Sequence, residues 1–171
     1  MKLYTIIGGV NGAGKSSLTG VLKTERSDLG KIIDVDKLAV QYGSFVEGGK
    51  AALQMQEQYI REGISFTQET TLSGQRPLRM IRQAKEAGYT VRLFYVGIGS
   101  AAEALKRIEN RVSKGGHNIA EEDVVRRFSE RNETLAKVLD FVDVIADISS
   151  FVRFDWVFCR RAGYETNTPI F

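Results

Sequence analysis

Apolar and polar residues follow one another along the chain in blocks that predict strands and helices in alternation. Short apolar runs predict strands over residues 3–7, 31–36, 65–69, 91–98, 142–148 and 152–159. Apolar residues recur at helical spacing directly after residue 16. The same spacing predicts helices over residues 48–61, 77–88, 101–112 and 121–139. This alternation is typical of an α/β fold with a mostly parallel sheet of five to six strands and helices on both faces. Ligands of such sheets bind beyond the carboxyl ends of the strands.

The loop after the first strand carries the most specific motif. Residues 9–16 read Gly-Val-Asn-Gly-Ala-Gly-Lys-Ser and match G-x-x-x-x-G-K-[ST] at every fixed position. Glycines allow the backbone N–H groups to face phosphate oxygens, Lys15 can reach the β- and γ-phosphates, and the Ser16 hydroxyl can bind Mg²⁺. The strand before the loop and the helix after it disfavour an incidental glycine turn. We therefore expect ATP and Mg²⁺ as cofactors, with Ser16 as metal ligand, bound by Gly9, Asn11, Gly12, Ala13, Gly14, Lys15, Ser16 and Ser17.

Polar residues stand at the ends of the second and third predicted strands. A kinase needs a carboxylate beside the acceptor hydroxyl, and Asp36 is the candidate base because it is nearer the strand end than Asp34. The alternative for Asp36 is capping of a helix at Lys37. Glu69 and Thr71 are expected on one side of the third strand, where they could bind substrate hydroxyl groups. The alternative for them is a polar turn.

Arginines surround a glycine pair at residues 115–116. Arg107 and Arg111 are four residues apart and therefore share a helix face, and Arg127 lies in the next predicted helix. Guanidinium groups suit phosphate oxygens, so residues 107–131 are predicted to form a helical lid with these three arginines as catalytic cations. The alternative is solvated ion pairs with neighbouring glutamates. The only histidine, His117, is expected to bond within its loop.

Composition narrows the class of protein further. The 171 residues are 43% hydrophobic, and 24 Lys and Arg against 21 Asp and Glu give a net charge of +3, too small to indicate nucleic-acid binding. One cysteine excludes an internal disulfide framework. No apolar run reaches the length of a membrane span, so a membrane is not expected as a partner. Nucleic acid is not expected either, because the net charge is small. The sequence predicts one domain over residues 1–171, located in the cytoplasm.

Several stretches in this order resemble the zeta-toxin family of P-loop kinases. They are the loop at residues 9–17, Ile33-Asp34-Val35-Asp36, Glu69-Thr70-Thr71-Leu72-Ser73, Gly88-Tyr89, and residues 107–117 with 126–128. The resemblance implies a P-loop kinase fold and, as in the better-known members, phosphorylation of the 3′-hydroxyl of UDP-N-acetylglucosamine. It implies that Asp36 is the base and that Glu69 and Thr71 hold the sugar nucleotide. It also implies that Arg111, with Arg107, stabilises the transferring phosphate, and that an antitoxin would be a separate chain.

Two other functions stay open from the sequence. A small-metabolite P-loop kinase of the shikimate or gluconate sort also carries Asp-x-Asp after its second strand. A nucleotide-dependent switch or binding module is a different class, but the Asn-Lys-x-Asp and Asp-x-x-Gly segments of guanine-reading proteins do not occur in this chain.

Overall fold

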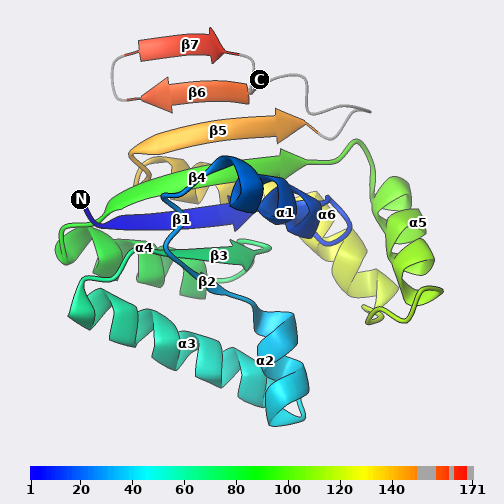
Figure 1. Ribbon diagram of the computed structural model, residues 1–171. Helices are drawn as coiled ribbons and strands as arrows, with labels where there is room; N and C mark the ends of the chain where they lie inside the picture. The colour runs from blue at the N-terminus through cyan, green and yellow to red at the C-terminus, as the bar shows by residue number, and fades with distance from the viewer. Residues whose placement is uncertain (150–156, 162–163, 169–171) are drawn as a thin grey trace.

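The computed structural model describes residues 1–149, 157–161 and 164–168 (Figure 1). The strands are β1 Leu3–Gly8, β2 Lys31–Ile33, β3 Phe66–Thr70, β4 Thr90–Gly97, β5 Val144–Ser149, β6 Val157–Arg161 and β7 Tyr164–Thr168. The helices are α1 Lys15–Glu25, α2 Val35–Tyr42, α3 Phe45–Glu62, α4 Arg76–Glu86, α5 Ala101–Val112 and α6 Glu121–Leu139. Helices α5 and α6 have the predicted bounds. Within the described part of the chain, no helix is long and apolar enough to cross a bilayer.

One sheet contains all seven described strands, in the order β2-β3-β1-β4-β5-β6-β7. Neighbours from β2 to β5 are parallel, whereas β6 pairs antiparallel with β5 and β7 antiparallel with β6. The predicted mostly parallel sheet is confirmed, with more strands than the five to six expected. The predicted strand at residues 152–159 lies partly outside the described residues. Strand β7 was missed because its sequence, Tyr-Glu-Thr-Asn-Thr, has no apolar run.

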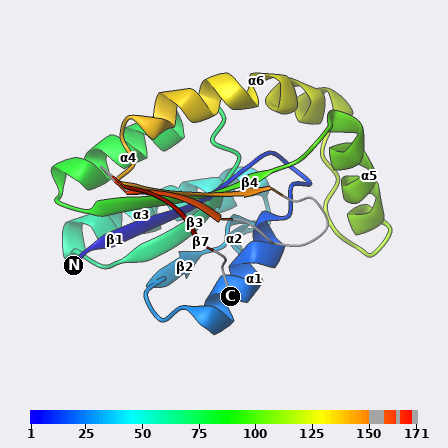
Figure 2. The ribbon, with the colours of Figure 1, turned by 90° about the horizontal axis from the view of Figure 1, so that it is seen from above.

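Helices cover both faces of the sheet, as the alternation of elements predicts. One buried cluster joins β1 and β4 to α1 and α5, and a second joins the same strands to α3 and α4. Helix α6 reaches both clusters, through Val124 near its start and Val138 near its end. Figure 2 shows α4 and α6 on one side of the strands and α1 on the other.

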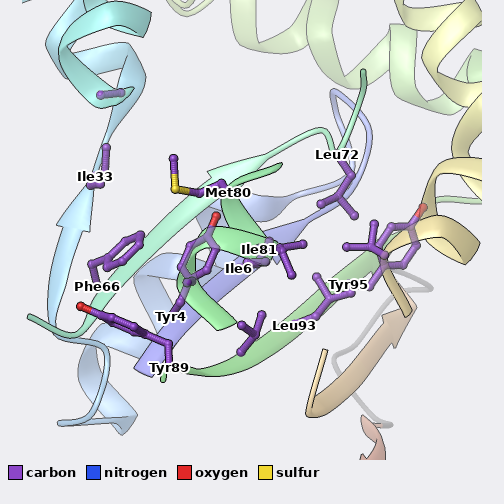
Figure 3. Packing of buried hydrophobic residues seen from close by; sticks show 14 residues of the cluster. Tyr4, Ile6, Ile33, Phe66, Leu72, Met80, Ile81, Tyr89, Leu93 and Tyr95 are labelled. Carbon is purple, nitrogen blue, oxygen red and sulfur yellow. The ribbon is translucent and has the colours of Figure 1, made fainter. Parts of the chain in front are cut away.

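Aromatic side chains fill the cluster beneath α3 and α4 (Figure 3). Tyr4 of β1 and Phe66 of β3 stack with ring centroids 4.5 Å apart, and Tyr89 meets Phe66 edge-on. Burying each large side chain contributes about 1.5–3 kcal/mol. This packing fixes β3 beside β1, with Ile7 opposite Glu69, and so sets which residues meet at the strand ends.

The second strand is shorter than predicted and is followed by a helix, which the sequence indicated only as the alternative to a strand-end Asp36. Strand β2 ends at Ile33, and the Asp34 side chain accepts a hydrogen bond from the Lys37 backbone N–H at 3.1 Å, which begins α2. Asp36 therefore lies in the first turn of α2 and not at a strand end. The prediction failed because a capping Asp and a strand-ending Asp have the same sequence pattern. The capping residue is Asp34, so Asp36 is not used for that purpose.

Candidate active site

The glycine loop connects β1 to α1 and forms one wall of a cavity of about 1200 Å³. Gly12 and Gly14 have φ angles of 77° and 107°, which L side chains rarely adopt. A Cβ atom at Gly12 would also lie 2.6 Å from the Ala104 carbonyl oxygen, because α5 packs directly on the loop. Both glycines are therefore required for the curl of the loop, and Gly12 also for its contact with α5.

Lys15 is folded back onto the loop. Its ammonium group donates to the carbonyl oxygens of Gly9 at 2.8 Å and Val10 at 3.0 Å. Burial lowers the pKa of Lys15 to about 8, while the Glu69 carboxylate acts in the opposite direction. Arg111 and Arg127 also lower this pKa, and Asp36 raises it. All four charged groups are thus close enough to Lys15 for their fields to act on it.

Glu69 faces the loop from the neighbouring strand. The Ser16 hydroxyl donates to one carboxylate oxygen of Glu69 at 2.9 Å, and the Thr19 hydroxyl lies 2.6 Å from the other. A hydroxyl group beside a carboxylate offers the hard oxygen donors that Mg²⁺ prefers, with phosphates and water completing its shell. Among the described residues no cluster of three or more His, Cys, Asp or Glu could form a protein-only metal cage. The donors present therefore suit a magnesium ion that arrives with a nucleotide.

The turn after β3 contains a strained residue. Strand β3 ends at Thr70, whose hydroxyl accepts a hydrogen bond from the Leu72 N–H at 3.1 Å. Leu72 has a φ of 60° and is 2% exposed, an unusual backbone for a leucine (Figure 3). A Cβ atom added to Gly8 would lie only 2.9 Å from a methyl carbon of the Leu72 side chain, so Leu72 packs closely against Gly8. This turn brings Thr71 to the cavity wall beyond the strand end.

The three predicted lid arginines all line the cavity, with different partners. Arg107 of α5 donates to the Ala13 carbonyl oxygen at 3.3 Å and to Glu103 at 2.6 Å, so it is engaged with the loop backbone. Arg111 donates to the His117 carbonyl oxygen at 2.7 Å. Arg127 of α6 donates to the Asn11 side chain at 2.8 Å, and its Nε is buried without a partner among the described residues. The loop of the lid touches α3, where the His117 ring packs edge-on against Phe45 at 4.9 Å.

The cavity brings together most residues that the sequence singled out. Asp36, Glu69 and Thr71 line it, as do all the predicted loop residues except Gly9 and Ala13, whose backbone carbonyl oxygens instead bond Lys15 and Arg107. Sequence reasoning missed Thr19, which stands one helical turn after Lys15 and therefore faces the same way. It also missed Gln56, a polar residue in the buried face of α3. In both helices the sequence signal was a spacing of four residues, which places Thr19 on the face of Lys15 and Gln56 on the face of Ala52.

Comparison with known proteins places these features in a family. The model of the zeta toxin family matches residues 41–157. An uncharacterised protein of Haemophilus influenzae is 35% identical in an alignment of 126 residues that covers 70% of this chain and 88% of that protein.

Solved structures share the fold at low identity. The PezAT toxin–antitoxin system of Streptococcus pneumoniae has a chain with a TM-score of 0.65 at 19% identity, covering 88% of this chain and 69% of its own. The AvrRxo1-ORF1:ORF2 complex with ATP gives a TM-score of 0.71 at 15% identity, over 98% of this chain and 60% of its own. A gluconokinase of Sinorhizobium meliloti gives 0.53 at 14% identity, over 90% and 85%.

The family match covers more than half of the chain, and the glycine loop that precedes it has the geometry of a nucleotide site. The chain thus belongs to the zeta toxin family of P-loop kinases, which are ATP-dependent phosphotransferases.

Proposed function

We propose that the protein transfers the γ-phosphate of ATP to a hydroxyl group of a sugar nucleotide similar to UDP-N-acetylglucosamine. The observation that carries this proposal is the position of Asp36. Its carboxylate lines the same cavity as Lys15, is close enough to raise the lysine's pKa, and makes no hydrogen bond or ion pair with a residue in the described segments. A carboxylate in this position is available to an acceptor hydroxyl.

In the proposed step, different residues of the cavity have different roles. Asp36 orients the acceptor hydroxyl and takes its proton as the acceptor oxygen bonds to the γ-phosphorus and the bond to the β,γ-bridging oxygen breaks, releasing ADP. Lys15, Arg111 and Arg127 stabilise the charge on the transferring group. Arg107 holds the loop that carries Lys15, which its bonds to the loop backbone and Glu103 support.

Magnesium would be held at Ser16, with Glu69 beside it. The hydrogen bond between these two residues supports this assignment, and a Mg²⁺ ion held there would neutralise charge on the phosphates. Glu69 would then contact the metal as well as the sugar nucleotide. Thr71 would be the residue that contacts the acceptor beyond the end of β3.

The wider biology of the family extends the proposal. We infer that residues 1–171 act as one kinase domain in the cytoplasm, with residues 107–131 as its lid, and that an antitoxin in a separate chain is the partner. The toxin–antitoxin neighbour supports the last point. Co-purification with the product of an adjacent reading frame would test it.

A substitution pair separates the proposed base from its structural neighbour. We expect Asp36→Asn to lower turnover by about 10²–10⁴-fold while leaving the affinity for MgATP unchanged. The control is Asp34→Asn, which makes the same chemical change two residues away but keeps the oxygen that caps α2, so turnover should stay near that of wild type. Incubation with ATP, Mg²⁺ and a panel of UDP-sugars, sugars and gluconate, followed by mass spectrometry, identifies the acceptor by a gain of one phosphate. Full turnover by Asp36→Asn, or phosphate transfer to gluconate alone, would contradict the proposal.

A further inference from the structure

A second, smaller cavity of about 200 Å³ adjoins the nucleotide site on the other face of β3. Val35, Glu69 and Thr70 line both cavities, so the two are neighbours at the end of this strand. Successive side chains of a strand point to opposite faces. Glu69 therefore faces the glycine loop, whereas Gln68 faces the cavity lined by residues of α3 and α4.

Gln56 is the unusual residue of this cavity. It continues the buried stripe of α3 that begins at Gly48 and Ala52, four residues apart, and is only 3% exposed. Its carboxamide nevertheless makes no hydrogen bond with a residue in any described segment. Its polar atoms are not enclosed by protein, because the fully buried side-chain atoms without a partner in the described residues are Arg92 Nε and Arg127 Nε. Because Gln56 lines the cavity, its carboxamide is available to a molecule that enters there.

Gln68 supplies a complementary set of donors. Its side-chain oxygen accepts a hydrogen bond from the Tyr4 hydroxyl at 3.3 Å, which leaves the amide N–H groups for other partners. Leu53 and Pro77 provide apolar walls. Two carboxamides between apolar walls match a flat group that both donates and accepts hydrogen bonds.

Charge disfavours an anion inside the cavity. The Glu69 carboxylate borders it and would repel a phosphate or carboxylate group. The nearest cation, Arg76, is exposed at the first residue of α4 and has no ion pair with the described residues. An anionic group of the same ligand would therefore lie at the rim, near Arg76, and a neutral group inside.

We propose that this cavity is the specificity pocket for the phosphate acceptor, in which Gln56 and Gln68 bind a neutral, planar amide-bearing group. The proposal rests on the proposed function, because it assumes that an acceptor approaches Asp36 from this side. A pyrimidine base and an acetamido substituent both carry the required amide, and the two are distinguished by experiment.

The test compares Gln56→Met with the control Gln54→Met, which changes an exposed glutamine of the same helix that does not line the cavity. The probes are UDP-glucose, N-acetylglucosamine 1-phosphate, UDP-N-acetylglucosamine and gluconate, with binding measured by calorimetry. We expect Gln56→Met to weaken binding of amide-bearing probes about tenfold or more. Its melting temperature should stay close to that of wild type, because the carboxamide makes no hydrogen bond with the described residues, and MgATP affinity should not change. Gln54→Met should behave as wild type.

The change in affinity for each probe then identifies the group that the pocket binds. A loss of affinity for UDP-glucose assigns the pyrimidine to the pocket, and a loss for N-acetylglucosamine 1-phosphate assigns the acetamido group. Affinities within twofold of wild type for every probe, or binding of gluconate alone or of no probe, would overturn the inference and leave the cavity to water. Transfer of phosphate to UDP-N-acetylglucosamine that is indifferent to Gln56 overturns this inference alone. Gln56-dependent binding without phosphate transfer contradicts only the proposed function.

Discussion

The lowered pKa of Lys15 predicts that MgATP affinity falls as the pH rises above 8. In the nucleotide-free protein this pKa is about 8, whereas an unfolded lysine has a pKa of 10.5. The triphosphate favours the charged ammonium group and raises the pKa again on binding. Binding above pH 8 must therefore be accompanied by proton uptake, and the cost of that uptake grows with pH.

The magnitude follows from the fraction of charged lysine. With a pKa of about 8, about nine-tenths of Lys15 is charged at pH 7 and about one-tenth at pH 9. If the bound form stays charged throughout, Kd for MgATP rises about tenfold between these pH values, or about 1.4 kcal/mol. At pH 8.5 about three-quarters of a proton should be taken up for each nucleotide bound.

Calorimetry in buffers of different ionisation enthalpy measures both quantities. The matched control is Lys15→Arg, whose guanidinium group stays charged over this range, so its Kd, although weaker, should not depend on pH through this residue. Titration of the nucleotide or of other groups would affect both proteins equally. A wild-type Kd constant within twofold from pH 7 to 9, or the same slope in Lys15→Arg, would refute the reasoning.

Three further substitutions test other contacts of the site. Glu69→Gln should raise the magnesium concentration for half-maximal turnover by about 10–100-fold, and an unchanged midpoint in a magnesium titration would count against Glu69. Arg127→Met should lower kcat by about 10²–10³-fold without unfolding the protein, whereas Arg126→Met, an exposed residue that bonds Asp123, should keep its activity. Leu72→Ala should cost about 2–5 kcal/mol in urea unfolding, and a loss below about 1 kcal/mol would show that the strained turn relaxes when its side chain is removed.

The sequence predicted the parallel sheet and the nucleotide loop well because both depend on local patterns. The loop motif fixes Lys15 and Ser16 relative to a strand and a helix, and that geometry is present. Helix α2 was only an alternative because it has just eight residues and follows the strand without a glycine or proline to separate them. Its start depends on one side-chain bond from Asp34, which no periodicity reveals.

The partners of the site residues were harder to predict, because they come from elements that are distant in sequence. Thr19 and Ser16 meet Glu69 across about fifty residues, and Arg127 meets Asn11 across 116. These contacts exist only because β3 pairs with β1 and α6 folds back over the loop. Strand order is a property of the whole sheet, so residue spacing could identify the candidate groups but not which of them bond.

The end of β3 borders both cavities, and that has a consequence for interpreting variants. Glu69 bonds Ser16 and Thr19 on the nucleotide side, while Gln68 faces the second cavity and Thr70 borders both. In the following turn the Leu72 side chain packs against Gly8, the last residue of β1 before the glycine loop. A change in this turn moves both sides together, because the strand end is one rigid backbone segment. Substitutions at Leu72 should therefore alter the affinities for ATP and acceptor jointly, whereas those at Lys15 and Gln56 should separate them.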